Sequence, residues 1–269
     1  MQLLITGAGT LAQALLERYP DAVLLTRGEY SVQRLRWRRP DVRAVIGDVR
    51  QTDLVYRAIV ESGAERVVHT AAMKQVGASG ANAIECASVN VDGTAAVVRA
   101  CQQAGVPLLF TSSDKAVEPL NTYGKAKALA EDIVLGAGYT VTRWGNIIRS
   151  RGSVLERWER TGQIVVTDLA WTRFWLTRDE AAAFVESVLG MDGGLHVRMS
   201  KAASMGDLAR AAQLAMRNPT CDERLNAAAP GEKPHERLAL DHAHSGEAPR
   251  YSVDELTEMI MRDMARWPL

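Results

Sequence analysis

Residues 2–16 read QLLITGAGTLAQALL, and the interpretation of the whole chain starts from them. Positions 2–6 form a short apolar run of the strand type, and an amphipathic helical pattern follows the glycine turn. The turn matches G-x-G-x-x-G/A, with Gly7, Gly9 and Ala12 in its defined positions. The first glycine permits a tight bend, the second lets the backbone approach a pyrophosphate, and the helix amino terminus attracts the anion. We predict a dinucleotide-binding unit here, with a purely structural glycine turn as the alternative. The predicted cofactor contacts in this turn are Gly7, Gly9, Thr10 and Leu11.

Strand-like and helical stretches alternate along the first half of the chain. This alternation predicts an α/β fold built on a Rossmann-like, doubly wound parallel sheet. The expected strands are 22–25, 42–46, 66–69, 106–110 and 139–144, and the expected helices are 52–62, 82–104 and 122–135.

The alternation loosens beyond residue 147. We predict a dinucleotide-binding domain over residues 1–147 and a small carboxyl-terminal lobe, mainly substrate-binding, over residues 148–269. Helix and strand patterns recur in residues 175–200, which we expect to return to the main sheet. The stretch 218–250 is the least regular and is the best candidate for a mobile loop.

Composition narrows the possible partners. The 269 residues carry 32 Lys+Arg and 32 Asp+Glu, so the zero net charge gives no reason to expect nucleic acid or an anionic membrane as a partner. No apolar run reaches the ~18 residues that a membrane span needs. The three cysteines, Cys86, Cys101 and Cys221, are too far apart to suggest a disulfide framework or a metal site. We therefore expect a reducing, cytoplasmic setting.

Further cofactor contacts are expected where later strands end. A site for NAD usually has an acid after the second strand, but Thr26-Arg27-Gly28 stands there. Arg27 can pair with a 2′-phosphate, which favours NADP; NAD remains possible if Arg27 is solvated and Glu29 serves as the acid. Small residues after the fourth strand would let the backbone approach a cofactor. The other predicted contacts are Asp48, Val49, Ala71, Ala72 and Lys74, and Lys74 could equally face substrate or solvent.

The stretch FTSSDKAVEPLNTYGKAK, residues 110–127, gathers the reactive side chains. Tyr123 and Lys127 are four residues apart, so a helix would place both on one face. Ser113, Asp114 and Lys115 follow the strand at its carboxyl end, where open α/β sheets hold ligands. The alternative for Asp114 and Lys115 is an ordinary surface salt bridge. We predict instead that a phenol, a hydroxyl and an acid–base pair meet at one place.

Taken in order, these motifs resemble the extended short-chain dehydrogenase/reductases. They are most similar to the nucleotide-sugar 4,6-dehydratases of polysaccharide biosynthesis, in particular the inverting UDP-N-acetylglucosamine 4,6-dehydratase group. The similarity extends from Met1 to about Glu236. In this chain Ser113 replaces the usual Thr, and Arg149 replaces a usual Gly, which could alter substrate fit. The matching stretches are ITGAGTLA, LLTRGE, GDVR, HTAAMKQV, SSDKAVEPLNTYGKAK, RWGNIIRSRGSVLERW, WTRFWLT and PGEKPHE.

The resemblance implies a reaction in three stages: oxidation at carbon 4 of a hexose, water loss across carbons 5 and 6, and hydride return to carbon 6. Tyr123 would take the proton of the carbon 4 hydroxyl, with Ser113 bonded to the same oxygen. Lys127 would favour the phenolate by its charge and hold the nicotinamide ribose. Lys115 would take the carbon 5 proton, and protonated Asp114 would donate to the leaving hydroxyl. A base on the other face of carbon 5 would give 5-epimerisation.

The resemblance also implies a nucleotide-sugar substrate and a homo-oligomer, a dimer or larger. Substrate contacts are expected from Lys74, Asn146, Arg151 and Arg173, although each arginine could be an ordinary loop residue. Phe174 and Trp175 are expected in the core. Two alternatives stay open: a 4-epimerase or reductase of the same superfamily, and a non-catalytic NADP-binding sensor.

Overall fold

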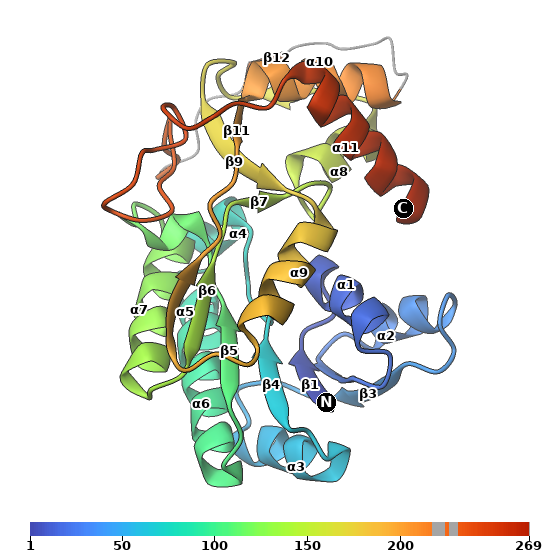
Figure 1. Cartoon of the computed structure of the whole chain (residues 1–269), viewed down its shortest axis with the longest axis vertical. Coiled ribbons are helices and arrows are strands. Elements are labelled where there is room, and N and C mark those ends of the chain that lie inside the picture. The colour runs from blue at the N-terminus through green and yellow to red at the C-terminus, as the bar shows by residue number, and fades with distance from the viewer. Residues whose placement is uncertain (217–223, 226–230, 269) are drawn as a thin grey trace.

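A parallel sheet of seven strands organises the first two thirds of the chain (Figure 1). The computed structural model describes residues 1–216, 224–225 and 231–268. The strand order is β10-β6-β5-β4-β1-β2-β3, so the chain moves outward from β1 to one edge and then returns past β1 to the other. The predicted Rossmann-like, doubly wound sheet is confirmed, and its switch point lies between β1 and β4. The strands are β1 (Leu3–Thr6), β2 (Val23–Thr26), β3 (Arg43–Ile46), β4 (Arg66–His69), β5 (Leu108–Thr111), β6 (Thr140–Arg143) and β10 (Gly194–Val197).

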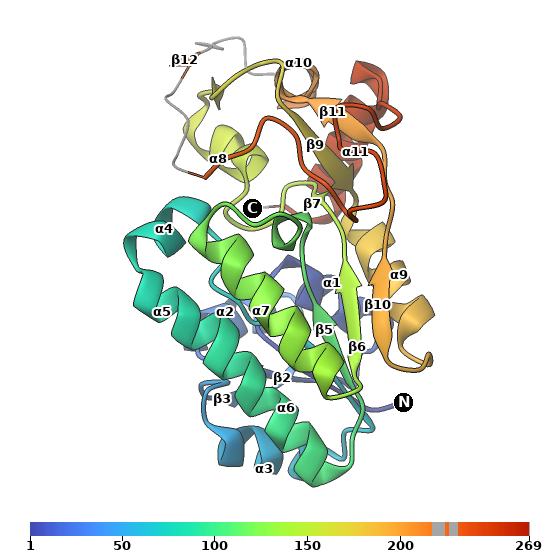
Figure 2. The same ribbon diagram turned by 90° about the vertical axis from the view of Figure 1, so that its left-hand side faces the viewer.

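Helices cover both faces of the sheet (Figures 1 and 2). Alternate residues of β1 explain this, because Leu3 and Ile5 pack into one apolar core while Leu4 packs into another. The first core includes α1 (Thr10–Arg18) and α9 (Arg178–Val188), with α2 (Glu29–Arg36) at its margin. The second includes α3 (Thr52–Ser62), α6 (Gly93–Ala104) and α7 (Thr122–Gly136).

The expected helix over residues 82–104 is not one regular helix. It consists of α5 (Ala83–Ala87), the π-helix η1 (Ser88–Asp92) and α6. A further short helix, α4 (Val76–Ala81), precedes it and was not predicted. A π-helix widens one turn, which is a feature that apolar periodicity does not reveal.

The remaining elements build a lobe that faces the carboxyl edge of the sheet (Figure 1). Phe174 and Trp175 lie in its buried strand β9, as expected for core residues. A third apolar core, around Trp158 and Leu208, joins the lobe's helices. The elements are β7 (Asn146–Ile147), α8 (Val154–Thr161), β8 (Val165–Val166), β9 (Thr172–Leu176), β11 (Ala202–Ser204), α10 (Met205–Met216), β12 (Arg224–Leu225) and α11 (Val253–Arg266).

A buried group of charges, which we call the lobe cluster, joins the lobe to the sheet domain: Arg149, Glu159, Arg178 and Asp263. Arg149 is fully enclosed, and its guanidinium donates to Glu159 at 2.7 Å and to Asp263 at 2.8 Å. Its φ of 47° lies in the left-handed region, where glycine is usual. The Arg149 side chain and backbone therefore connect α8, α9 and α11, and the expected effect of this residue on substrate fit stays a prediction.

The irregular stretch expected to be a mobile loop lies partly outside the described residues, as does Cys221. Its described part, from Gly231 to Arg250, is irregular but buries Leu238 and Ser245 completely. Among the described residues, no helix has the length and apolar character to cross a membrane.

Candidate functional site

The β1–α1 turn has the shape that a dinucleotide phosphate needs. Gly7 has φ +88°, and a Cβ there would lie 3.2 Å from the backbone of Ala71. Gly9 caps α1 without a side-chain hydrogen bond, and a Cβ there would meet nothing within 4 Å. Space is therefore open beside Gly9 at the amino end of α1, as the approach of an anion requires. Thr10 accepts a 2.8 Å hydrogen bond from the backbone of Arg151, which brings a lobe loop to this turn.

The loop after β4 is fixed beside the glycine turn. Thr70 donates to the Thr6 carbonyl at 2.6 Å, and Ala71, which precedes Ala72, lies next to Gly7. Asn90, buried in the π-helix, accepts from Met73 N at 2.8 Å and donates to Met73 O at 2.9 Å. A polar residue within an apolar helix commonly bonds a neighbouring helix. The partner of Asn90 is instead a loop, and the only signal was a polar residue in an apolar helix.

Arg27 stands at the end of β2 in a network of four charges. Its guanidinium lies 3.3 Å from Asp48 and 3.3 Å from Glu85, and Arg50 pairs with the same two acids. The hydrogen bond from Arg50 is the main reason that the pKa of Asp48 is lowered. The Arg27 side chain remains 53% exposed, so it can still reach a further anion. Val49, after Asp48, is buried.

The reactive stretch folds as the 3₁₀ turn η2 (Asp114–Ala116) followed by α7. Asn121 caps α7 by accepting from Gly124 N at 2.8 Å. A Cβ at Gly124 would overlap the carbonyl of Lys115, so the glycine lets the helix press against the turn. This close packing places Tyr123 of α7 beside the charges of η2.

Tyr123 and Lys127 are both buried, on one face of α7. Burial and the charge of Asp114 raise the pKa of Tyr123, while a hydrogen bond with Ser113 acts in the opposite direction. Burial lowers the pKa of Lys127 to about 7, and Glu131 opposes that change. The Lys127 ammonium donates to the Thr111 carbonyl at 2.6 Å. The expected lowering of the Tyr123 pKa by Lys127 is therefore not seen in this structure.

Asp114 and Lys115 form a pair between a buried carboxylate and a half-buried ammonium rather than a surface salt bridge. Asp114 is fully buried, and its Oδ1 accepts from Ser113 at 2.8 Å and from Lys115 at 3.0 Å. Asp114 Oδ2 is shielded from solvent and makes no hydrogen bond to any residue that the structure describes. A carboxylate oxygen in this condition retains the capacity to bond a substrate hydroxyl.

Two further charges reach this pair from the late segment, and sequence reasoning did not select them. Glu236 lies 3.9 Å from the Lys115 ammonium and 3.2 Å from that of Lys233. Lys233 and Glu236 are 8% and 3% exposed, which excludes ordinary surface roles. We call Asp114, Lys115, Lys233 and Glu236 the reaction cluster. The only sequence signal for the last two was their place in PGEKPHE.

The predicted substrate contacts do not form one group. Asn146 Nδ2 donates to Phe174 O at 3.3 Å, and Arg173 donates to Pro234 O at 3.1 Å near the reaction cluster. The exposed Arg151 instead points to Ser31 of α2, at 3.1 Å, on the side of the glycine turn. Lys74 donates to Ser150 at 3.4 Å. Its residue is exposed overall, but protein atoms around the ammonium partly desolvate it and lower its pKa to about 8.

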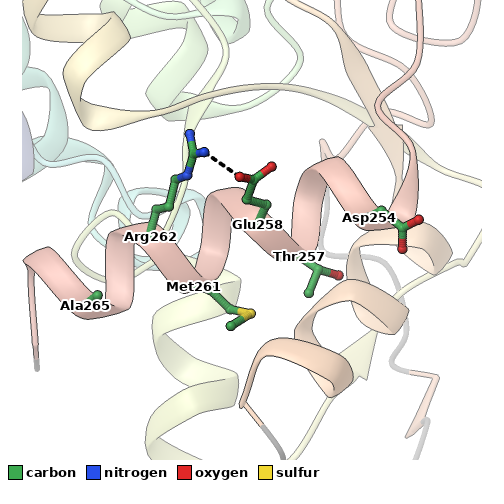
Figure 3. Close-up of a pocket in the computed structure, with 6 residues that line it drawn as sticks. All are labelled: Asp254, Thr257, Glu258, Met261, Arg262 and Ala265. Carbon is green, nitrogen blue, oxygen red and sulfur yellow. Dashed lines mark hydrogen bonds and ion pairs between the residues drawn. The ribbon is translucent and has the colours of Figure 1, made fainter.

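Away from these residues, a hollow of about 430 Å³ lies along α11 (Figure 3). It is lined by one helix alone and contains Met261 and the exposed pair Glu258–Arg262. It holds none of the predicted site residues, so we assign it no chemistry. Across the residues described, no cluster of three or more His, Cys, Asp or Glu side chains could hold a metal ion.

Comparison with known proteins agrees with this geometry. The sequence model of the family described as "Polysaccharide biosynthesis protein" matches residues 3–255. The chain is 30% identical to the inverting UDP-N-acetylglucosamine 4,6-dehydratase of Campylobacter jejuni, over 90% of this chain and 78% of that enzyme. It is 29% identical to a UDP-glucose 4-epimerase of Rickettsia bellii, over 78% and 70% of the two chains.

Solved structures share the fold along the whole chain. Pen from Bacillus thuringiensis superposes with a TM-score of 0.90 at 26% identity, covering 98% of this chain and 97% of that one. The dTDP-glucose 4,6-dehydratase DesIV from Streptomyces venezuelae gives a TM-score of 0.73 at 18% identity, covering 100% and 99%. The second likeness bears on the fold alone.

Proposed function

We propose that this protein is an NADP-dependent nucleotide-sugar 4,6-dehydratase. The chain belongs to the polysaccharide biosynthesis protein family of extended short-chain dehydrogenase/reductases. The substrate is UDP-N-acetylglucosamine or a related UDP-hexosamine. One observation carries the proposal: a buried Asp114–Lys115 pair with a free carboxylate oxygen lies next to Tyr123. Oxidation or epimerisation at carbon 4 needs Tyr123 and Lys127, whereas water loss also needs an acid and a base for carbons 5 and 6.

The glycine turn and the ends of β2 and β4 fit a dinucleotide, because they offer open amides and close backbone approach. A nicotinamide held there supplies the acceptor that stores a hydride and gives it back. Gly7, Gly9, Thr10 and Leu11 would hold the pyrophosphate. The remaining contacts would come from Arg27, Asp48, Val49, Ala71, Ala72, Lys74, Tyr123 and Lys127.

Proton movement follows the hydrogen bonds around Ser113. The raised pKa of Tyr123 keeps its phenol protonated, so Tyr123 takes the proton of the carbon 4 hydroxyl as its own proton passes through Ser113 to Asp114 Oδ1. The proton released at carbon 4 can thus reach Asp114. Asp114 then donates it to the hydroxyl that leaves carbon 6. One proton consumed by water loss is therefore supplied by the oxidation that precedes it.

Lys115 takes the proton from carbon 5 once carbon 4 is a ketone. Burial alone would lower the pKa of Lys115, but the charges of Asp114 and Glu236 outweigh it and raise that pKa. The ammonium is therefore the resting form, and only the neutral amine can accept a proton. The rate of water loss should rise with pH as that amine forms.

The test is mass spectrometry of the purified protein incubated with UDP-N-acetylglucosamine in deuterated water. The expected product has lost one water and carries deuterium at carbon 5. Lys115→Ala should still oxidise carbon 4. Asp114→Asn should oxidise it more slowly, because the acceptor of the carbon 4 proton is lost, and neither variant should release dehydrated product. Dehydration at the wild-type rate by either variant would contradict the role assigned to the residue that was substituted.

A 4-epimerase is the second candidate, favoured by the similarity to the Rickettsia bellii enzyme. Its product has the mass of its substrate, so the same experiment separates the two activities. An epimerase should also tolerate Lys115→Ala. A protein that binds NADP but changes no sugar in a panel of nucleotide sugars would be a sensor instead.

The preference for NADP rests on Arg27. Its exposed guanidinium suits a 2′-phosphate, although Asp48 and Glu85 compete for it. We expect Arg27→Met to weaken NADP binding about tenfold and leave NAD binding unchanged. Equal dissociation constants for the two cofactors in the wild type would show that Arg27 stays within its acid network.

A further inference from the structure

We infer that Glu236, anchored by Lys233, is a positioning residue for Lys115, and that residues 231–236 thereby form part of the reaction site. The reaction step assigned to Lys115 rests on the function proposed above. The charge coupling between Glu236 and Lys115 does not.

The late segment is attached to the reactive stretch at three successive points. Asn121, the cap of α7, donates to the Gly231 carbonyl at 3.1 Å. Gly231 has φ +81°, and a Cβ there would lie 2.9 Å from that of Asn121, so only glycine permits the approach. Lys233 donates to the Val117 carbonyl, directly after η2, at 2.6 Å. Figure 1 shows this segment, in orange-red, over the amino end of α7.

The third point is the carboxylate of Glu236. Its Oε2 faces Lys233 at 3.2 Å and its Oε1 faces Lys115 at 3.9 Å. Ser245 holds the Glu236 backbone by accepting from its N–H at 2.9 Å. One carboxylate therefore lies between two ammonium groups, within ion-pair distance of both, although its Oε2 makes no hydrogen bond to any residue that the structure describes.

The charges that act on Lys115 come from every element packed around it. Asp114 on η2 and Glu236 on the late segment stabilise its ammonium, and Arg173 on β9 disfavours it. Lys233 neutralises part of the Glu236 charge. Tyr123 on α7 is neutral because its pKa is raised. Removing the charge of Glu236 must lower the pKa of Lys115, whereas removing that of Lys233 must raise it.

Because the two substitutions should shift the Lys115 pKa in opposite directions, they distinguish a charge effect from a purely structural role. The variants are Glu236→Gln, Glu236→Asp and Lys233→Met, and Glu247→Gln is the control because Glu247 is an exposed acid of the same region. Trace labelling with acetic anhydride, read by mass spectrometry at Lys115 across a pH series, reports the neutral amine without any turnover. The rate of water loss is measured over the same pH series.

We expect the Lys115 labelling midpoint to fall by about one pH unit in Glu236→Gln and to rise in Lys233→Met. Glu236→Asp should lie between the wild type and Glu236→Gln, and the control should not move. The pH-dependent limb of water loss should follow the labelling midpoint. Its maximum rate in Glu236→Gln should fall by up to about 100-fold because the amine is misplaced.

A wild-type midpoint and rate in Glu236→Gln would overturn the inference, as would midpoints that move in the same direction in Glu236→Gln and Lys233→Met. If circular dichroism shows that Glu236→Gln is unfolded, Glu236→Asp decides by the same two readouts. A labelling shift in a protein that dehydrates no sugar would support the coupling and refute the proposed function, so the two failures are distinct.

Discussion

The lobe cluster and the reaction cluster are each built from two acids and two cations, of which all but Glu159 and Lys115 are buried, but the two clusters differ in how completely they are paired. In the lobe cluster, Arg149 and Arg178 contact every carboxylate oxygen of Glu159 and Asp263 within 3.0 Å. In the reaction cluster, Asp114 Oδ2 has no partner among the described residues, and Glu236 is 3.9 Å from Lys115.

The choice of cation explains part of this difference. Arginine presents a planar fork that binds carboxylates at several points, and it stays charged. Lysine presents a single ammonium whose pKa changes readily on burial. An arginine network in which every carboxylate oxygen is contacted fixes two parts of a fold together. A lysine network in which Asp114 Oδ2 and Glu236 Oε2 make no hydrogen bond to the described residues is held less completely and keeps the capacity to bond a ligand and move a proton.

The largest effect should come from the reaction cluster's neighbour, Tyr123. Tyr123→Phe removes the group that accepts the carbon 4 proton, so turnover should fall by about 10³-fold or more. The fold should persist, because the phenol makes no hydrogen bond that the lobe depends on. Turnover and thermal melting are measured together. Full activity in this variant would contradict the assignment of Tyr123 as the group that accepts the carbon 4 proton.

The lobe cluster should show the reverse pattern. Asp263→Asn leaves Arg149 and Arg178 buried with Glu159 as the remaining acid. Loss of one partner from a buried pair costs about 3–5 kcal/mol, so the free energy of unfolding in urea should drop by that order. Activity per folded molecule should stay near the wild-type value. A stable but inactive variant would contradict the division between the two clusters.

Lys127 sharpens the comparison, because this buried cation donates to a carbonyl oxygen rather than to a carboxylate. Its pKa is about 7 in the folded protein, and the unfolded chain keeps its proton until about pH 10. Raising the pH above 7 therefore favours the folded state. Relative to Lys127→Met, the wild type should gain about 1 kcal/mol of unfolding free energy per pH unit near pH 8. A pH-independent difference in urea unfolding would place the Lys127 pKa outside this range.

The smallest effect should come from an exposed pair on α11, Glu258 and Arg262 (Figure 3). Pairs of this kind contribute about 0.5 kcal/mol or less. Glu258→Gln should therefore change urea unfolding very little and is the natural control for Asp263→Asn on the same helix. A loss comparable to that of Asp263→Asn would mean that helix α11, rather than burial of charge, determines the stability of the lobe.

Local patterns in the sequence were sufficient for the strands of the sheet and for several of the helices that cover it. The helix Thr52–Ser62 and the strand Arg66–His69 were predicted to the residue, because apolar periodicity and flanking glycines mark such elements. The glycine turn and the pair Tyr123–Lys127 were visible for the same reason. Each is a short motif whose members lie within a few residues of one another.

Features that depend on distant partners were not visible. Glu236 lies near Lys115, which is more than one hundred positions earlier, and no pattern in the neighbouring sequence predicts that contact. Arg149 was expected to affect substrate fit, and only the fold shows that its guanidinium donates a hydrogen bond to Asp263. The pKa of Tyr123 was expected to be lowered by Lys127, but burial and the charge of Asp114 raise it.

The attachment of residues 231–236 to the reactive stretch has a consequence for the order in which the protein is made. The ribosome releases Asp114 and Lys115 long before Glu236, so a nascent chain can form most of its parallel sheet while the acid–base site still lacks its last carboxylate. Translation stopped in that interval would yield a fragment without the Glu236 contact. The site is therefore completed only after synthesis has passed residue 236.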